Sequence, residues 1–365
     1  MRILLNLLLL FSCATLCAEA PGIYIQPGGR HPFHEWRPWQ PLQLGVSYFN
    51  LTRDDGNFHL WFNASFEGRD SLIRLEGADL DHLERTPPQF DTRIVKNYDL
   101  DLDGLPSPLL SRASGLRLRD GTELVQGSVG PRYRGGGSEL FPALFLRKED
   151  DAWHHLGPPP GEPEDLLNAI RAHAASVRSE GGGLIELPDG RLRIYLHGLP
   201  EHDRFAEMIS GNRLIRHSLL VAESDHPEGP WTFLREQQGE RINLYPADTL
   251  PWLFVHVQPL GDTGYMLTGA DQWPPKNIYA AYSTDGLHFV TPADPDTHEP
   301  LPLMRARELA PDAQFCKALR GTLLEDAKTF TAIMNISRPR DRGRSMLYFS
   351  ESAFDADLFH ALFQP

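Results

Sequence analysis

The sequence predicts an all-β protein, a five-bladed β-propeller in which residues 21–365 form a single domain. Three observations support this prediction. A hairpin of two short apolar strands around a tight turn recurs five times along the chain. A third strand follows each hairpin, and the repeat period lies near or above the upper end of known blade lengths. Only Pro163 to Val177 has apolar residues at helical spacing, so we expect one short helical insertion between blades two and three.

The turns between the paired strands are the strongest local signals. Asp-Gly between two apolar runs favours a hairpin, because aspartate and glycine tolerate the positive φ angles that a tight turn requires. The five turn sequences are Asp55-Gly56, Asp120-Gly121, Asp189-Gly190, Asp262-Thr263-Gly264 and Glu325-Asp326. We expect the first strand of the first hairpin over Gly45–Phe49.

The N-terminal residues 1–20 read as a secretory signal peptide. A basic start, an apolar run from Ile3 to Phe11 and the small residues Ala18 and Ala20 around Glu19 are typical of one. The short signal favours a bacterial protein that is secreted or periplasmic. A lipid anchor on Cys13 or Cys17 is an alternative that the flanking residues fit poorly.

The composition limits the classes of partner. The chain is 41% hydrophobic and has a formal net charge of -14. This acidic balance argues against nucleic acid and anionic membranes as partners and fits a soluble exported enzyme or binding protein, which we expect to be a monomer. Removal of the signal leaves Cys316 as the only cysteine, so an internal disulfide is excluded.

We expect no metal and no cofactor. His31 and His34 with Glu35 invite a zinc interpretation, but they lack a helical context and a third defined ligand. The acidic residues of Asp99 to Asp103 lack the twelve-residue loop that holds calcium. The glycines at 135–137 do not follow a strand and open a helix, as a phosphate-binding loop would.

Glu180 is the leading candidate for a catalytic residue. It stands directly before three glycines at the start of a predicted strand, and glycine lets a backbone approach either a ligand or another strand closely. In a propeller the inner strands begin near the axis, so the equivalent positions of all blades converge. By projection, the equivalent positions in the other blades are Gln40, Arg112, Asp248 or Trp252, and Asp312, and we expect these residues to lie near the axis with Glu180.

These residue types suit a sugar pocket. Two carboxyl groups that flank a glycosidic bond, one protonated and one ionised, can hydrolyse it. Glu180 would be the acid, and Asp312 or Asp248 the base. Arg112 could bind a carboxylate or sulfate of an acidic sugar, or instead form an ion pair with one of the acids.

An aromatic residue could stack on the apolar face of a sugar ring. The candidates are Trp252 before the fourth hairpin, and Trp39, which with Trp36 precedes the first. The alternative is that the N-terminal pair packs over the rim of the propeller.

Two shared phrases and the glycine run carry a family resemblance. They are Ser224-Asp225 to Gly229-Pro230-Trp231, Ser283 to Phe289, and Glu180-Gly181-Gly182 before an Asp-Gly hairpin. With the blade rhythm, residues 40–365 resemble the five-bladed propeller glycoside hydrolases, the group of arabinanases, β-xylosidases, invertases and mannoside phosphorylases. The resemblance implies that Glu180 is the general acid.

The sequence departs from that family at two places. The family has an aspartate at the start of the first blade, where residues 39–45 hold no carboxylate, and another in the second blade, where this chain has residues 111–114, Ser-Arg-Ala-Ser. The run from Glu180 to Leu192 also resembles a phrase of bacterial sialidases, which have six blades.

These observations predict a secreted glycoside-hydrolase-like protein that acts on an oligosaccharide or polysaccharide. Two alternatives stay open. The missing first-blade aspartate favours a non-catalytic propeller that binds carbohydrate or protein. Arg112 would suit a sialidase or polysaccharide lyase that acts on acidic sugars.

Overall fold

The computed structural model describes most of the chain after residue 20. The described residues are 21–364 without 47, 67–68, 92–107, 132–140, 148–152, 156–175, 200–217, 235–241, 243, 245–251, 272–273 and 340–344. The predicted signal peptide, residues 1–20, therefore lies outside them. So does nearly all of the predicted helical insertion, because only Ser176 and Val177 of it are described, as the start of a strand.

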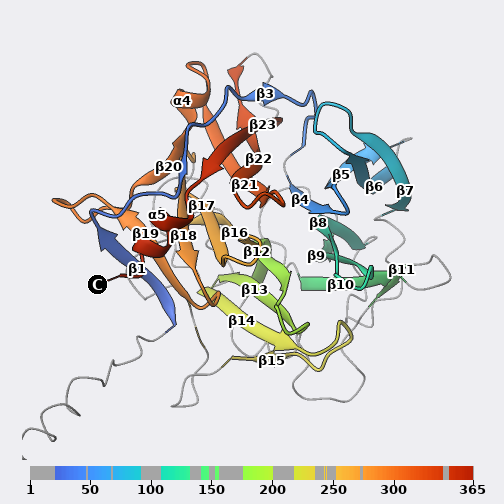
Figure 1. Ribbon diagram of the computed structural model, residues 1–365. Helices are drawn as coiled ribbons and strands as arrows, with labels where there is room; N and C mark the ends of the chain where they lie inside the picture. The colour runs from blue at the N-terminus through green and yellow to red at the C-terminus, as the bar shows by residue number, and fades with distance from the viewer. Residues whose placement is uncertain are drawn as a thin grey trace, which may run out of the picture.

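The described residues are mainly β-strands, in four sheets arranged around a common centre (Figure 1). The first sheet consists of β4 (Phe49–Asp54), β5 (Asn57–Phe66), β6 (Arg69–Gly77) and β7 (Glu84–Asp91). The second consists of β8 (Pro108–Arg117), β9 (Glu123–Pro131), β10 (Phe141–Arg147) and β11 (Trp153–His155). The predicted all-β class is confirmed.

The third sheet has ten strands and contains two antiparallel meanders. One meander consists of β12 (Ser176–Glu186), β13 (Leu192–Leu199), β14 (Ser218–Ser224) and β15 (Thr232–Phe233). The other consists of β16 (Leu253–Pro259), β17 (Tyr265–Ala270), β18 (Asn277–Ser283) and β19 (His288–Ala293), with β20 (Pro302–Arg305) beside β18 and β1 (Gly22–Pro27) beside β19. A single parallel pair, Gly182 with His256, joins the two meanders. The hydrogen-bonded sheets therefore number four, whereas the sequence predicts five blades.

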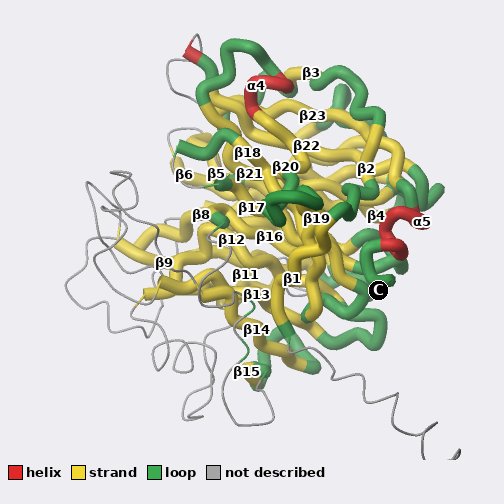
Figure 2. The backbone as a smooth tube through the Cα atoms, turned by 90° about the vertical axis from the view of Figure 1, so that its left-hand side faces the viewer, coloured by secondary structure: helices red, strands yellow, loops and turns green. Residues whose placement is uncertain are grey.

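The fourth sheet combines both ends of the chain. It consists of β21 (Phe315–Leu323), β22 (Thr329–Ser337) and β23 (Ser345–Phe354), and the short strands β2 (Phe33–His34) and β3 (Gln40–Pro41) pair with β23. Helix α5 (Ala356–Ala361) follows β23, and Figure 2 shows it close to β2. A backbone hydrogen bond from Asp355 to Pro32 fixes this proximity.

The first strands of the successive meanders form a closed ring. Strand β4 contacts β8, β8 contacts β12, β12 contacts β16, β16 contacts β21, and β21 contacts β4. All five lie near the middle of the view in Figure 1. Because the chain passes from sheet to sheet in order, the ends of these strands meet around one centre, which is a propeller-like arrangement.

The predicted hairpin turns are confirmed. Asp55 and Gly56 have φ angles of 46° and 81° between β4 and β5, as a tight turn requires. Gly121 and Gly190 also have positive φ, 87° and 88°. The sequence predicts the first strand of the first hairpin over Gly45–Phe49, but β4 begins at Phe49. Its pairing with β5 runs from Phe49 to Asp54, directly beside the turn, so the strand lies later in the chain than predicted.

The core lies between the sheets. Trp231 and Phe289 are buried, each directly after a turn between two strands. His31 ties the N-terminal segment to this core, because Tyr282 Oη lies 2.9 Å from its Nδ1 and the Leu301 carbonyl 3.0 Å from its Nε2. In the part of the chain that the structure describes, no helix is long and apolar enough to cross a membrane.

Candidate functional site

The glycine run brings β12 against β16. Gly182 pairs with His256, and the next residue, Gly183, has a φ of 115°. A Cβ atom on Gly183 would lie 2.6 Å from the Val257 carbonyl oxygen, closer than such atoms approach. Of the two roles that the sequence leaves open for these glycines, the structure shows the close approach of another strand.

Glu180 lies close in the chain to this pairing. Glu180 is part of β12, two residues before Gly182, and β12 and β16 run parallel. Between Val177 and Gly182 the register of β12 against β13 shifts, so Glu180 lies in an irregular part of the strand just before the pairing with His256. The side chains of Glu180 and Arg112 lie outside the described part of the structure, and so does the whole of Asp248.

Two buried polar side chains lie next to this point. His256 on β16 is 9% exposed, and Arg320 on the neighbouring first strand β21 is 7% exposed. Arg320 donates through Nη1 to its neighbour Leu319 (2.9 Å) and through Nη2 to the Phe254 carbonyl (3.5 Å). The position of a Cβ on Gly183 is 3.4 Å from His256 Nδ1, so the imidazole also lies beside β12.

Burial determines the charge of both side chains. Desolvation, and after it the charge of Arg320, holds the pKa of His256 well below its ordinary value, so its imidazole is neutral at pH 7. Desolvation also lowers the pKa of Arg320, but a guanidinium starts so far above neutrality that it keeps its charge. The site therefore combines one fixed cation with one neutral ring.

Both side chains retain unused hydrogen-bonding capacity. Among the described residues His256 has no hydrogen bond, Arg320 has only the two to carbonyls, and no carboxylate pairs with Arg320. Gln258 accepts from the Gly321 amide at 3.0 Å, while its Nε2 is buried without a partner. Buried polar groups are normally satisfied, so unmet donors gathered among β12, β16 and β21 indicate a place for a polar ligand.

Asp312 lies in the turn before β21, at the end of the ring where the first strands begin. Its Oδ1 is 3.7 Å from Arg338 Nε, and its side chain is 48% exposed. The Arg338 guanidinium in turn lies over the ring of Tyr348, 4.7 Å from its centroid. Asp312 is therefore accessible and already has a cationic neighbour.

Three predicted binding residues lie elsewhere. Trp252 is 3% exposed and stacks on Tyr279, with ring centroids 5.5 Å apart, so it packs in the core and is not open to a sugar. Gln40 is exposed on β3, which pairs with β23. Strand β3 is three strand spacings from β21, roughly 14 Å, so Gln40 lies at the outer edge and not at the axis.

Trp39 lies at the same outer edge. It stacks on Trp36 with centroids 5.5 Å apart, and Trp36 contacts Phe330 edge-on. This is the rim packing that the sequence leaves open as the alternative. The projection places Gln40 at the axis because it assigns the segment before the first hairpin to the start of an inner strand, whereas the segment pairs with the last sheet.

The projection misses His256 and Arg320. A signal for them is present in the sequence, since each is a polar residue within a first strand that is otherwise largely apolar, Leu253–Pro259 and Phe315–Leu323. Among the described residues no group of three or more His, Cys, Asp or Glu side chains could hold a metal ion.

No protein-family model matches the sequence, and no curated protein matches it. Solved structures do. The Cellvibrio cellulosa α-L-arabinanase complexed with arabinohexaose is 9% identical, the match covers 88% of this chain and 99% of the arabinanase, and the TM-score is 0.52. At this identity the likeness shows the fold alone, which is that of a propeller-type glycoside hydrolase.

Two further structures are reported with it. A thermostable family-43 glycoside hydrolase is 11% identical over 90% of this chain and 92% of its own, with a TM-score of 0.49. The Bacteroides ovatus xyloglucan GH43B is 15% identical over 86% of this chain, with a TM-score of 0.49. The match covers 54% of that protein, so this chain spans about half its length.

Proposed function

We propose that the protein is a glycoside hydrolase-like β-propeller of five blades that acts on an oligosaccharide or polysaccharide outside the bacterial cytoplasm. In this proposal the ten-stranded sheet supplies two of the blades. The closed ring of five first strands supports the blade number, because each meander contributes one strand to it. Residues 1–20 would direct export as a signal peptide and then be removed.

The observation that carries the proposal is the pair of buried, incompletely bonded side chains beside the strand of Glu180. A guanidinium donates several hydrogen bonds, and a neutral imidazole both donates and accepts. Arg320 and His256 can therefore hold the hydroxyl groups of a sugar next to Gly182 of β12. Burial makes these hydrogen bonds stronger than the same bonds in water.

Glu180 is the proposed general acid, which donates a proton to the leaving oxygen. Hydrolysis also requires a second carboxylate across the bond, as base or nucleophile. The segment from Trp36 to Arg53, which leads into β4 and runs along it, contains no Asp or Glu. The second carboxylate must therefore come from another meander, and Asp312 and Asp248 are the candidates.

The same missing carboxylate supports the second candidate function, a propeller that binds a carbohydrate or a protein without cleaving it. In that case Arg320 and His256 contribute only binding. The positive charge of Arg320, unpaired among the described residues, also suits an acidic sugar, as a sialidase or lyase would require.

The test compares wild type with Glu180→Gln on a panel of plant and algal oligosaccharides, neutral and acidic. Glu228→Gln, an exposed glutamate in the turn after β14, is the matched control. We expect loss of Glu180 to lower kcat by about 10²- to 10⁴-fold, the contribution of a positioned acid, and Glu228→Gln to leave it unchanged.

Three outcomes decide between the candidates. Turnover that survives in Glu180→Gln removes the assigned acid. Binding without turnover of any substrate by the wild type favours the non-catalytic propeller. Turnover restricted to uronate or sialate substrates favours the lyase or sialidase.

A further inference from the structure

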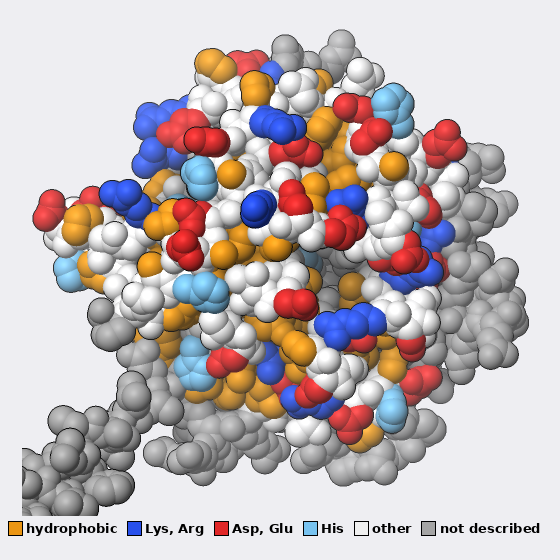
Figure 3. Space-filling model, in the orientation of Figure 1, with side chains coloured by type: hydrophobic (Ala, Val, Ile, Leu, Met, Phe, Trp, Pro, Cys, Tyr) orange, Lys and Arg blue, Asp and Glu red, His pale blue; other side chains and the backbone are white. Residues whose placement is uncertain are grey.

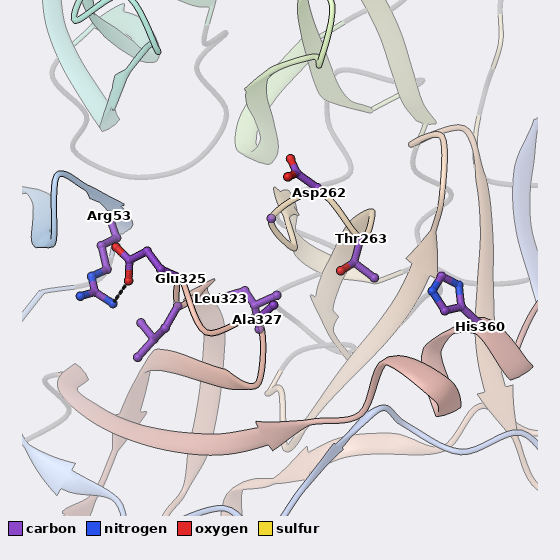
Figure 4. Close-up of a pocket in the computed structure, with 9 residues that line it drawn as sticks. Arg53, Asp262, Thr263, Leu323, Glu325, Ala327 and His360 are labelled. Atoms are coloured by element: carbon purple, nitrogen blue, oxygen red, sulfur yellow. Dashed lines mark ion pairs between the residues drawn. The ribbon is translucent and has the colours of Figure 1, made fainter.

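A pocket lies among the turns at the ends of the first strands opposite to the candidate site. Its volume is about 510 Å³, within the range of small-molecule sites. The β16–β17 and β21–β22 turns, the end of β4 and helix α5 form its walls (Figure 4). Its lining includes Arg53, Asp262, Thr263, Leu323, Glu325 and His360.

This pocket is separate from the candidate site. The candidate site reaches Phe254 at the beginning of β16, whose carbonyl accepts from Arg320, whereas Asp262 and Thr263 follow the end of the same strand at Pro259. Five strand residues span about 16 Å. The two sites therefore lie at opposite ends of the ring of first strands.

The polar groups of the pocket favour a neutral ligand. Glu325 is paired with Arg53, whose Nη1 is 2.8 Å from the carboxylate, so this charge is balanced. An anion would meet the carboxylates of Asp262 and Glu325. A cation would meet the Arg53 guanidinium and only one unbalanced carboxylate, Asp262.

The remaining groups suit hydroxyls. Among the described residues, the side chains of Asp262, Thr263 and His360 make no hydrogen bond or ion pair, so a carboxylate, a hydroxyl and an imidazole are all available. Figure 4 shows Arg53 and Glu325 at one end of the pocket and His360 at the other, with Asp262 and Thr263 between them. Leu323 adds apolar surface, against which the C–H face of a sugar ring can pack.

The walls are rigid turns, so the pocket is preformed. Asp326 accepts hydrogen bonds from the backbone amides of Lys328 (2.8 Å) and Thr329 (2.9 Å), and the Ala327 amide bonds back to Leu324 at 2.9 Å. A preformed site loses less conformational entropy when a ligand binds.

The geometry points to a second ligand site in this pocket, which takes a neutral saccharide and holds it at the end of the propeller away from Glu180. The site is non-catalytic and does not depend on hydrolysis at the other end. Its role is to hold a longer saccharide chain, or a neighbouring saccharide chain, on the protein.

The test measures binding by isothermal titration calorimetry in the Glu180→Gln background, which prevents turnover. The neutral probes are xylohexaose, arabinohexaose and cellohexaose, and the charged probes are hexagalacturonate and a glucosamine hexamer. Asp262→Ala removes an acceptor and Thr263→Phe fills the pocket, while Asp296→Ala, an exposed turn aspartate elsewhere, is the control.

We expect a neutral hexasaccharide to bind, Asp262→Ala to weaken one binding event about tenfold, and Thr263→Phe to abolish it, with Asp296→Ala unchanged. Failure of every neutral probe, tighter binding of a charged hexamer, or equal affinity in all three variants would overturn the proposal. Wild-type turnover is scored separately, so the loss of the proposed hydrolysis and the absence of this site give different results.

Discussion

Gly183→Ala tests whether the close approach of β12 to β16 builds the candidate site. Gly183 has a φ of 115°, which costs a residue with a Cβ about 1 to 3 kcal/mol. The new Cβ would also lie 2.6 Å from the Val257 carbonyl oxygen and 3.2 Å from the Val257 amide nitrogen. Both are backbone atoms that no rotamer change can move, and overpacking of this kind costs about 1 to 3 kcal/mol more. We therefore expect the free energy of unfolding to fall by about 2 to 6 kcal/mol.

Gly190→Ala is the matched control, because it carries the backbone cost without the contact. Gly190 has a φ of 88° in the turn of the same hairpin, and nothing lies within 4 Å of the position of its Cβ. Its expected cost is only about 1 to 2 kcal/mol. The difference between the two variants isolates the contact with β16.

The assay is urea denaturation followed by tryptophan fluorescence, with the slope of the transition compared between variants. Oligosaccharide binding is measured in parallel, because the Cβ of Gly183→Ala would also lie 3.4 Å from His256 Nδ1. Equal destabilisation by the two substitutions would refute the close packing of β12 on β16. Unchanged sugar binding in a folded Gly183→Ala variant would separate His256 from the site.

Two further predictions concern the buried Arg320 and the part-buried His31. Arg320→Met should leave the free energy of unfolding within about 1 kcal/mol of wild type, because removal of a buried charge also removes its desolvation cost. The same substitution should lower sugar affinity or turnover at least tenfold. If the arginine were purely structural, the denaturation assay would show a loss of stability and the binding assay no loss of affinity. Burial lowers the pKa of His31 from 6.5 to about 4, so the unfolded chain takes up a proton before the folded one. The contribution of His31 to stability is therefore complete above pH 6.5 and falls by about 3 kcal/mol between pH 6.5 and 4, a loss that urea titrations should find absent in His31→Gln.

The candidate site could be predicted only in part. The glycine run marks β12 as a first strand, and the parallel pairing of Gly182 with His256 lies two residues after Glu180. Gln40 is misplaced by the projection, and Trp39 packs at the rim, which is the alternative that the sequence leaves open. Residues 33–34 and 40–41 pair with the edge of β23. An edge strand has free backbone groups, and here the N-terminal segment supplies their partners.

What the sequence determines by itself is local. Asp55-Gly56 and Gly190 specify their turns because few residues adopt positive φ, and apolar runs beside them specify strands. Only the tertiary structure decides that His256 and Arg320, 64 positions apart in the chain, become neighbours and are largely removed from water. That outcome depends on how whole sheets pack around the centre, and packing between distant segments leaves no signal in the spacing of nearby residues.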